Sequence, residues 1–127
     1  MKSNGDLAQG WLRKAESDFS NAELCVNNST ALDTACFHCQ QAAEKSLKAW
    51  LIRRDQNFPL THDLKELVGL CAMHEPQFGD LVGDAEALNP YAVKGRYAAD
   101  FWPSIDDAQA ALEQARRIYQ SVRDHWS

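Results

Sequence analysis

Residues 35–49, which read ACFHCQQAAEKSLKA, decide the fold. They form the middle of a longer run, residues 32–54, in which apolar side chains recur every three or four positions. That spacing predicts an amphipathic helix with one buried stripe. The stripe consists of Leu32, Ala35, Cys36, Cys39, Ala42, Ala43, Ser46, Leu47, Trp50 and Leu51. The opposite side carries Gln40, Gln41, Glu44, Lys45 and Lys48.

The segments on either side show the same helical spacing. Residues 6–26 and residues 105–125 are each predicted as a long helix with one apolar stripe. Shorter helices are predicted around residues 64–71 and 81–88. No stretch alternates strictly between apolar and polar residues, so no sheet is expected. The simplest way to bury these apolar faces is an all-α, antiparallel up-and-down bundle of four or five helices, forming one domain over residues 1–127.

Turn and cap signals set the expected boundaries of these helices. Residues 30–33 (TALD) and 104–107 (SIDD) have the spacing of capping boxes. Thr61 is expected to cap the third helix. Residues 89–103, NPYAVKGRYAADFWP, contain both Gly and Pro and are predicted to be a loop rich in aromatic residues.

Composition excludes several classes of function. The chain has 127 residues and a formal net charge of −5, so it does not hold nucleic acid through a general positive charge. It contains no run of about 18 apolar residues and no secretory signal in residues 1–10, so we expect no membrane span and no export. The four cysteines then indicate reduced thiols in the cytoplasm.

Four pieces of the sequence, in order, resemble the HEPN family of small helical proteins. Residues 35–49 look like its signature helix, and THDL at residues 61–64 is similar to the SHDL that opens its third helix. Trp11 with residues 15–19 (AESDF) resembles its first helix, and Tyr91 followed by Arg96-Tyr97 resembles its Y…RYP loop. The resemblance spans residues 7–125. It implies a helical bundle that forms homodimers, nucleotide binding in some members, and a small nucleotidyltransferase as partner.

The sequence departs from the ribonuclease members of that family. Those members carry an Arg and a later His with four to six residues between them. Here the two nearest pairs, Arg54 with His62 and Arg117 with His125, leave seven residues between. Because the usual catalytic pair is missing, we predict a binding or interaction module. The alternative is a divergent ribonuclease toxin that uses Arg96 together with His62 across the fold.

Basic and aromatic residues suggest where a nucleotide or an RNA phosphate would bind. Lysines supply point charges, an arginine supplies a planar fork, and a tyrosine ring supplies a surface on which a base can stack. The predicted site comprises Gln41, Lys45, Lys48, His62, Tyr91, Lys94, Arg96 and Tyr97. The competing interpretation is that the lysines complement the helix dipole and pair with Glu44. We interpret Gln40, Gln41 and Glu44 as either a polar network at a dimer seam or a plain exposed face.

Cysteines and tryptophans have competing interpretations of their own. Cys36-x-x-Cys39 and Cys71-x-x-His74 have the residue types and pair spacing of a zinc site, so a zinc-stabilised module is a further alternative. The cysteines also lie on apolar stripes, where a thiol is an ordinary core residue, and the sequence calls for no cofactor. Trp11, Trp50 and Trp126 are expected in the core or at a dimer interface, and Trp102 as a lid over the end of the bundle.

Overall fold

The computed structural model describes residues 3–127, apart from the side chain of Arg96. It contains the helices α1 (Asn4–Asn27), α2 (Leu32–Arg53), α3 (Leu64–Ala72), α4 (Val82–Leu88), α5 (Tyr91–Tyr97) and α6 (Ile105–Asp124), with a 3-10 helix η1 (Pro76–Leu81) before α4. No strand occurs within residues 3–127. The prediction of an all-helical bundle is therefore confirmed.

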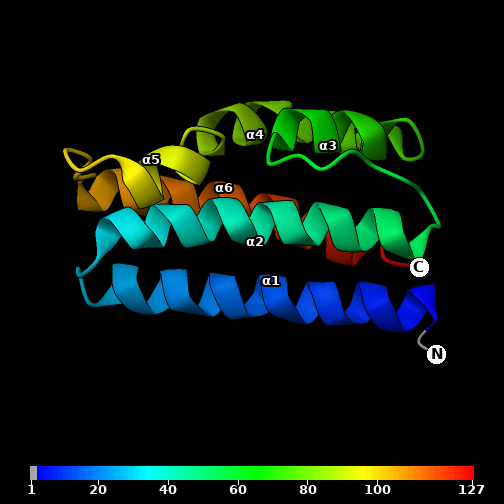
Figure 1. Ribbon diagram of the computed structural model, residues 1–127, viewed down its shortest axis with the longest axis horizontal. Coiled ribbons are helices and arrows are strands. Elements are labelled where there is room, and N and C mark those ends of the chain that lie inside the picture. The colour runs from blue at the N-terminus through cyan, green and yellow to red at the C-terminus, as the bar shows by residue number, and fades with distance from the viewer. Residues whose placement is uncertain (1–2) are drawn as a thin grey trace.

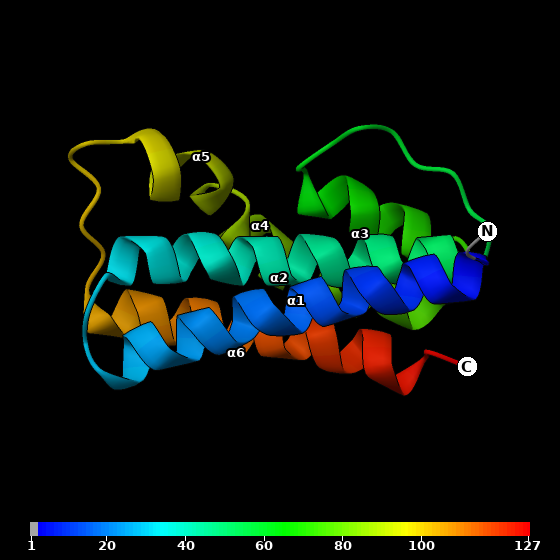
Figure 2. The same ribbon diagram turned by 60° about the horizontal axis from the view of Figure 1, so that its bottom comes forward.

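Helix α2 lies at the centre of the bundle (Figure 1). Helix α1 packs along it and runs in the opposite direction, whereas α6 packs along it in the same direction (Figures 1 and 2). The shorter helices α3, α4 and α5 cover the side of α2 that α1 leaves free. After α2 the chain returns along the surface through residues 54–63, which we call the return segment, before α3 begins.

The core forms where α2, η1 and α6 meet. Trp50, Leu47, Phe78 and Ile118 are almost completely buried there. The rings of Trp50 and Phe78 meet edge to face with their centroids 4.8 Å apart, and the Trp50 indole donates to the carbonyl of His125 at 2.9 Å. A buried indole needs such an acceptor for its N–H. Trp50 is therefore a core residue, as its place on the stripe predicts.

Of the two predicted capping boxes, one is confirmed and the other is wrong. Ser104 caps α6 in a complete capping box with Asp107, as predicted. The box predicted over residues 30–33 is wrong, because the residue before α2 is Ala31, which is left-handed at φ 48° and makes no side-chain cap. Ser29 is also left-handed, at φ 49°. The tight reversal between α1 and α2 thus takes the place of a cap.

The start of α3 also differs from the prediction. Asp63, not Thr61, is the capping residue, and its carboxylate accepts from the main-chain N–H groups of Lys65 and Glu66. The Thr61 hydroxyl instead accepts from the N–H of Asp63, 3.0 Å away. The side chain of Asn89 donates to the Asp63 carboxylate, which ties the start of α3 to the end of α4.

The prediction of a loop over residues 89–103 is wrong for its first half, which forms α5. Gly95 explains why a helix fits there. A Cβ at Gly95 would lie 2.7 Å from the Cβ of Phe37, so glycine allows the backbone of α5 to rest directly on α2. Trp102, beyond this helix, is 77% exposed and does not form the predicted lid.

The outer face of α1 is also less covered than the sequence predicts. Trp11 lies on the apolar stripe but is 40% exposed, and its neighbour Leu7 is 44% exposed.

Among the described helices, none is both long and apolar enough to span a membrane.

Candidate functional site

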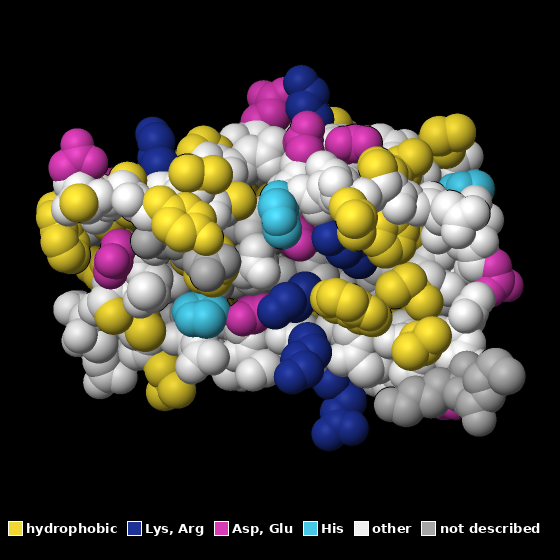
Figure 3. Space-filling model, viewed as in Figure 1, with side chains coloured by type: hydrophobic (Ala, Val, Ile, Leu, Met, Phe, Trp, Pro, Cys, Tyr) yellow, Lys and Arg dark blue, Asp and Glu magenta, His cyan; other side chains and the backbone are white. Residues whose placement is uncertain are grey.

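Basic, acidic and histidine side chains gather in the middle of the face over α2 (Figure 3). Hydrophobic side chains flank this polar region on both sides in the same view. Two ionic clusters account for the polar region, one around Glu44 and one around Asp18. Both acidic residues are nearly buried, Glu44 at 4% and Asp18 at 8% exposure.

The Glu44 cluster joins α2 to the return segment. One oxygen of Glu44 accepts from the Lys48 amine at 3.0 Å, and the other lies 2.9 Å from Nδ1 of His62. Because an ionised carboxylate only accepts, we assign the proton to Nδ1 in this contact. The His62 side chain is 74% exposed, and among the described residues its Nε2 has no partner. One imidazole nitrogen is therefore fixed and the other is free to meet a ligand.

Gln40 completes the Glu44 cluster on its buried side. Its side chain is fully buried, and its amide donates to the main-chain carbonyl of His62 at 3.0 Å and to Glu44 at 3.2 Å. Gln41 in turn donates to the carbonyl oxygen of Gln40 at 2.7 Å. The alternative of a plain exposed face is wrong for Gln40 and Glu44, because the return segment folds over them.

The Asp18 cluster joins α1 to α2. Asp18 accepts from the Lys45 amine at 2.7 Å and lies 2.9 Å from Nδ1 of His38. The Lys45 side chain is 24% exposed and that of His38 is 29% exposed. Lys45 and Lys48 are thus both paired with an acid, and for Lys48 this is the pairing with Glu44 that the competing interpretation predicts.

The residues predicted on α5 lie at another part of α2. Gly95 places α5 over Phe37, and Lys45 follows Phe37 by about two helical turns. Tyr91 is half-buried against Phe101, and burial is the main cause that raises the pKa of its hydroxyl. Tyr91 therefore does not offer the exposed stacking surface that was predicted for it.

The other predicted residues of α5 are reported only as far as they are described. Lys94 and Tyr97 are exposed on the outer side of the helix. The side chain of Arg96 lies outside the described residues. The structure thus gathers Lys48 and His62 around Glu44, with Gln41 joined through Gln40 and Lys45 on the neighbouring Asp18. Tyr91, Lys94 and Tyr97 lie apart from them on α5.

Comparison with protein-family models decides the family. The model of the HEPN domain matches residues 8–125. The chain belongs to the HEPN family. No curated protein matches the sequence.

Solved structures have the same fold as this HEPN chain. A protein from Thermus thermophilus superposes with a TM-score of 0.77 at 30% identity, covering 92% of this chain and 96% of its own. An archaeal HEPN homologue has a TM-score of 0.77 at 23% identity, with both chains fully covered. A HEPN domain protein from Thermotoga maritima has a TM-score of 0.75 at 21% identity, covering 91% of this chain and 95% of its own.

The arginines of the two Arg–His pairs nearest to the HEPN ribonuclease spacing both make structural contacts. Arg54 donates to the carbonyl of His125, and its guanidinium lies 3.8 Å from the ring centroid of Trp50. Arg117 forms an ion pair with Asp84 at 2.8 Å. The ring of His125 lies 2.9 Å from the carbonyl oxygen of Ser121.

The cysteines of this HEPN domain are core residues. Cys36, Cys39 and Cys71 are fully buried, and burial raises the pKa of Cys36 and Cys71 to about 12 and that of Cys39 still higher. Zinc binds the thiolate form, which these pKa values disfavour. No three of the described His, Cys, Asp and Glu side chains are grouped to hold a metal. The geometry gives the zinc-stabilised module no support.

Sequence reasoning missed Asp18 and His38 as members of the Asp18 cluster. Glu44 and Lys48 carried a signal, because a four-residue spacing brings them together on one helix. Asp18 and His38 carried none, since they meet only after α1 has packed on α2.

Proposed function

We propose that this protein is a HEPN-family binding module that holds the phosphate of a nucleotide or RNA over the Glu44 cluster. The observation that carries the proposal is the fixed, exposed imidazole of His62, whose Nδ1 is held by the buried Glu44. Lys48 and Lys45 add two positive charges along the same face. The family match supports a binding role, because this chain lacks the Arg–His spacing of the ribonuclease members.

The chemistry of the site follows from which hydrogens remain available. A phosphate oxygen is an acceptor, and the Nε2 of His62 donates to it whenever both ring nitrogens carry a proton. The Lys48 and Lys45 amines each have three hydrogens, so pairing with one carboxylate leaves others for a ligand. Because Glu44 and Asp18 also repel an anion, we expect modest affinity that weakens as salt is added.

Calorimetric titration tests the proposal directly. ATP, GTP and a short single-stranded RNA are titrated into the protein at about 50 mM and about 200 mM salt. We expect saturable binding that weakens at the higher salt and is lost in His62→Ala. Lys65→Ala is the control, because Lys65 is an exposed lysine on α3 that pairs with Glu86. The proposal is wrong if none of the three ligands binds the wild-type protein.

The remaining features of the proposal come from the family. We propose a cytoplasmic homodimer that partners a minimal nucleotidyltransferase, as one half of a toxin–antitoxin pair. Light scattering across micromolar concentrations tests the homodimer, and a mass equal to one chain would refute it. Co-expression with a nucleotidyltransferase encoded beside the gene tests the partnership, which requires that the two proteins co-purify.

A divergent ribonuclease toxin is the second candidate. The same observation favours it, because an exposed imidazole oriented by a buried carboxylate is suited to remove or supply a proton. Its partnership between Arg96 and His62 stays a prediction, since the side chain of Arg96 is not described. Incubation of RNA with the wild-type protein, and separately with His62→Ala, tests this candidate. It requires cleavage by the wild type and none by the folded variant.

A further inference from the structure

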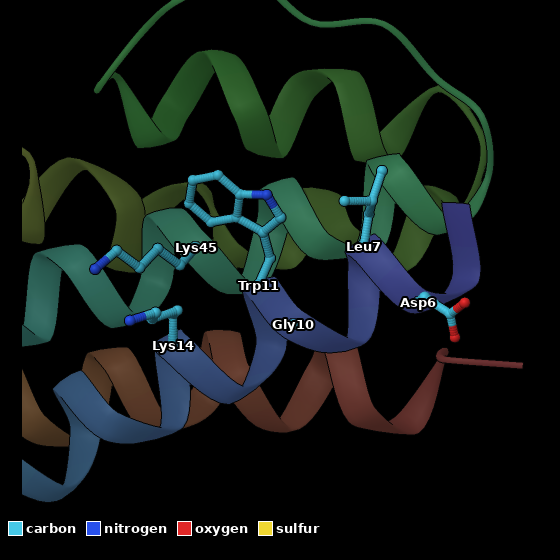
Figure 4. A pocket seen from close by; sticks show the side chains of 6 residues that line it. All are labelled: Asp6, Leu7, Gly10, Trp11, Lys14 and Lys45. Atoms are coloured by element: carbon cyan, nitrogen blue, oxygen red, sulfur yellow. The ribbon is translucent and has the colours of Figure 1, made fainter. Parts of the chain in front are cut away.

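A shallow cavity of about 480 Å³ lies on the outer surface of α1, beside the Asp18 cluster. It is lined by Asp6, Leu7, Gly10, Trp11, Lys14 and Lys45 (Figure 4). The indole of Trp11 lies in the middle, the amines of Lys14 and Lys45 point the same way at one end, and Asp6 lies at the other end. The volume is within the range of pockets that take small molecules.

The distribution of unpaired positive charge singles out this cavity. Most described lysines and arginines bond to a carboxylate or a main-chain carbonyl: Lys45, Lys48, Arg53, Arg54, Lys65, Arg116, Arg117 and Arg123. Among the described basic side chains, Arg13, Lys14 and Lys94 have no such partner. Arg13 and Lys14 both line a second hollow that adjoins the cavity at Gly10. In a chain of net charge −5, the unpaired Lys14 in the cavity and the unpaired Arg13 in the adjoining hollow suit an anionic ligand.

Trp11 supplies the apolar half of the cavity. Its side chain is 40% exposed, although tryptophan is usually well covered in a folded domain. Within residues 3–127, no other ring and no cation packs on the indole, and no protein acceptor takes its N–H. A partly exposed indole beside two amines matches the two halves of a nucleotide, a base to stack and a phosphate to neutralise.

We propose that this cavity is a base-stacking subsite for a nucleotide or single-stranded RNA, with the base on Trp11 and its phosphate on Lys14 and Lys45. The inference rests on the proposed function, and Lys45 connects the two, because it lines the cavity and also belongs to the Asp18 cluster. Asp6, at the end away from the amines, lies where it repels the phosphate least (Figure 4). An RNA strand bound over the Glu44 cluster thus extends past Lys45 onto Trp11.

Fluorescence and calorimetry with adenosine monophosphate and a six-nucleotide oligoadenylate test the subsite. We expect both ligands to quench tryptophan fluorescence. Trp11→Ala should weaken oligoadenylate binding about tenfold, since stacking on one aromatic ring has that order of effect. Lys14→Ala should lower the salt dependence by about one phosphate contact. Trp102→Ala is the matched control, because Trp102 is an exposed tryptophan outside the cavity.

A second variant fills the cavity and leaves Trp11 and both amines in place. A Cβ at Gly10 would meet no atom within 4 Å, so Gly10→Leu projects into open space, and it replaces a poor helix former with a good one. We expect it to weaken oligoadenylate binding without lowering the melting temperature.

The outcomes separate the subsite from the proposed function. If the wild-type protein binds oligoadenylate and both Trp11→Ala and Gly10→Leu bind it equally well, the subsite is wrong and the proposed function stands. If the wild-type protein binds neither adenosine monophosphate nor oligoadenylate, the subsite is wrong, and the proposed function is then decided by the titration with ATP, GTP and RNA. If the variants change self-association instead of ligand binding, the cavity is a protein interface and the subsite is again wrong.

Discussion

The Glu44 and Asp18 clusters have the same composition but different surroundings. Each carboxylate holds one lysine and one histidine. In the Glu44 cluster the lysine is only 11% exposed and the buried Gln40 amide also depends on the carboxylate. In the Asp18 cluster the lysine is 24% exposed, and among the described residues no buried side-chain amide bonds to Asp18. The burial of the partners, rather than the number of ion pairs, should therefore decide what each cluster contributes to stability.

The largest expected effect is that of Glu44→Ala. It leaves the Lys48 ammonium without its acid and the Gln40 amide short of an acceptor, which should lower the free energy of unfolding by about 3 kcal/mol. Urea denaturation measures the loss. Glu86→Ala is the control, because Glu86 forms an exposed ion pair with Lys65 and should cost less than about 1 kcal/mol. Equal losses for the two variants would show that burial of the partners does not decide what an ion pair contributes to stability.

Asp18→Ala should cost less, about 1 kcal/mol, because both His38 and Lys45 reach water once their acid is gone. The same change frees Lys45 and removes a negative charge beside the proposed phosphate site. Nucleotide affinity should therefore rise while stability falls. Urea denaturation and calorimetry on one preparation measure both quantities, and a drop in affinity would contradict the placement of Lys45 in the site.

Asp63, the last residue of the return segment, allows a test that depends on pH. Asp63→Ala removes the cap of α3 and should cost about 1 kcal/mol at neutral pH. The hydrogen bond from Asn89 is the main cause that lowers the pKa of Asp63, helped by the N–H groups of Lys65 and Glu66. A lowered pKa stabilises the fold above the unfolded value, ordinarily 3.8, and this contribution is lost as the pH falls through the folded value.

The cost of Asp63→Ala should accordingly shrink between about pH 7 and about pH 2. Asp63→Asn is the control, since it keeps an acceptor for the cap but has no charge to titrate. The difference in free energy of unfolding between the wild type and either variant, Asp63→Ala or Asp63→Asn, should therefore change with pH across that range. A difference that does not change with pH would show that Asp63 is not stabilised as a carboxylate.

The smallest expected effect on stability is that of His62→Ala. The ring is 74% exposed, so its contact with Glu44 should add less than about 1 kcal/mol. Together with the loss of ligand binding expected above, this separates a binding residue from a structural one. A loss of stability as large as that of Glu44→Ala would make His62 a structural residue instead.

Helical periodicity was sufficient to predict most of the bundle. It placed Leu47, Trp50 and Ile118 in the core, and all three are buried. It also found α6 together with its cap at Ser104. These features depend on residues three or four apart, which a sequence displays directly.

Features that depend on distant segments could not be predicted in this way. Gln40 and Glu44 are polar, so their place on α2 left open either a polar network or an exposed face, and only the path of the return segment shows that they are buried. Gly95 and Pro90 suggested a loop, because the close contact of Gly95 with Phe37 is invisible in the sequence. Trp11 fits the apolar stripe of α1, yet its side chain is 40% exposed and lines an open cavity.

The return segment also divides the molecule into two pieces of chain. Leu60, within it, is fully exposed, which makes this stretch accessible to a protease. The fragment before the cut would contain α1 and α2, and the fragment after it α3 to α6. Because Trp50 and Leu47 share one core with Phe78 and Ile118, a nicked chain should elute as a single assembled species. This HEPN domain is thus suited to fragment complementation, with the chain divided at Leu60.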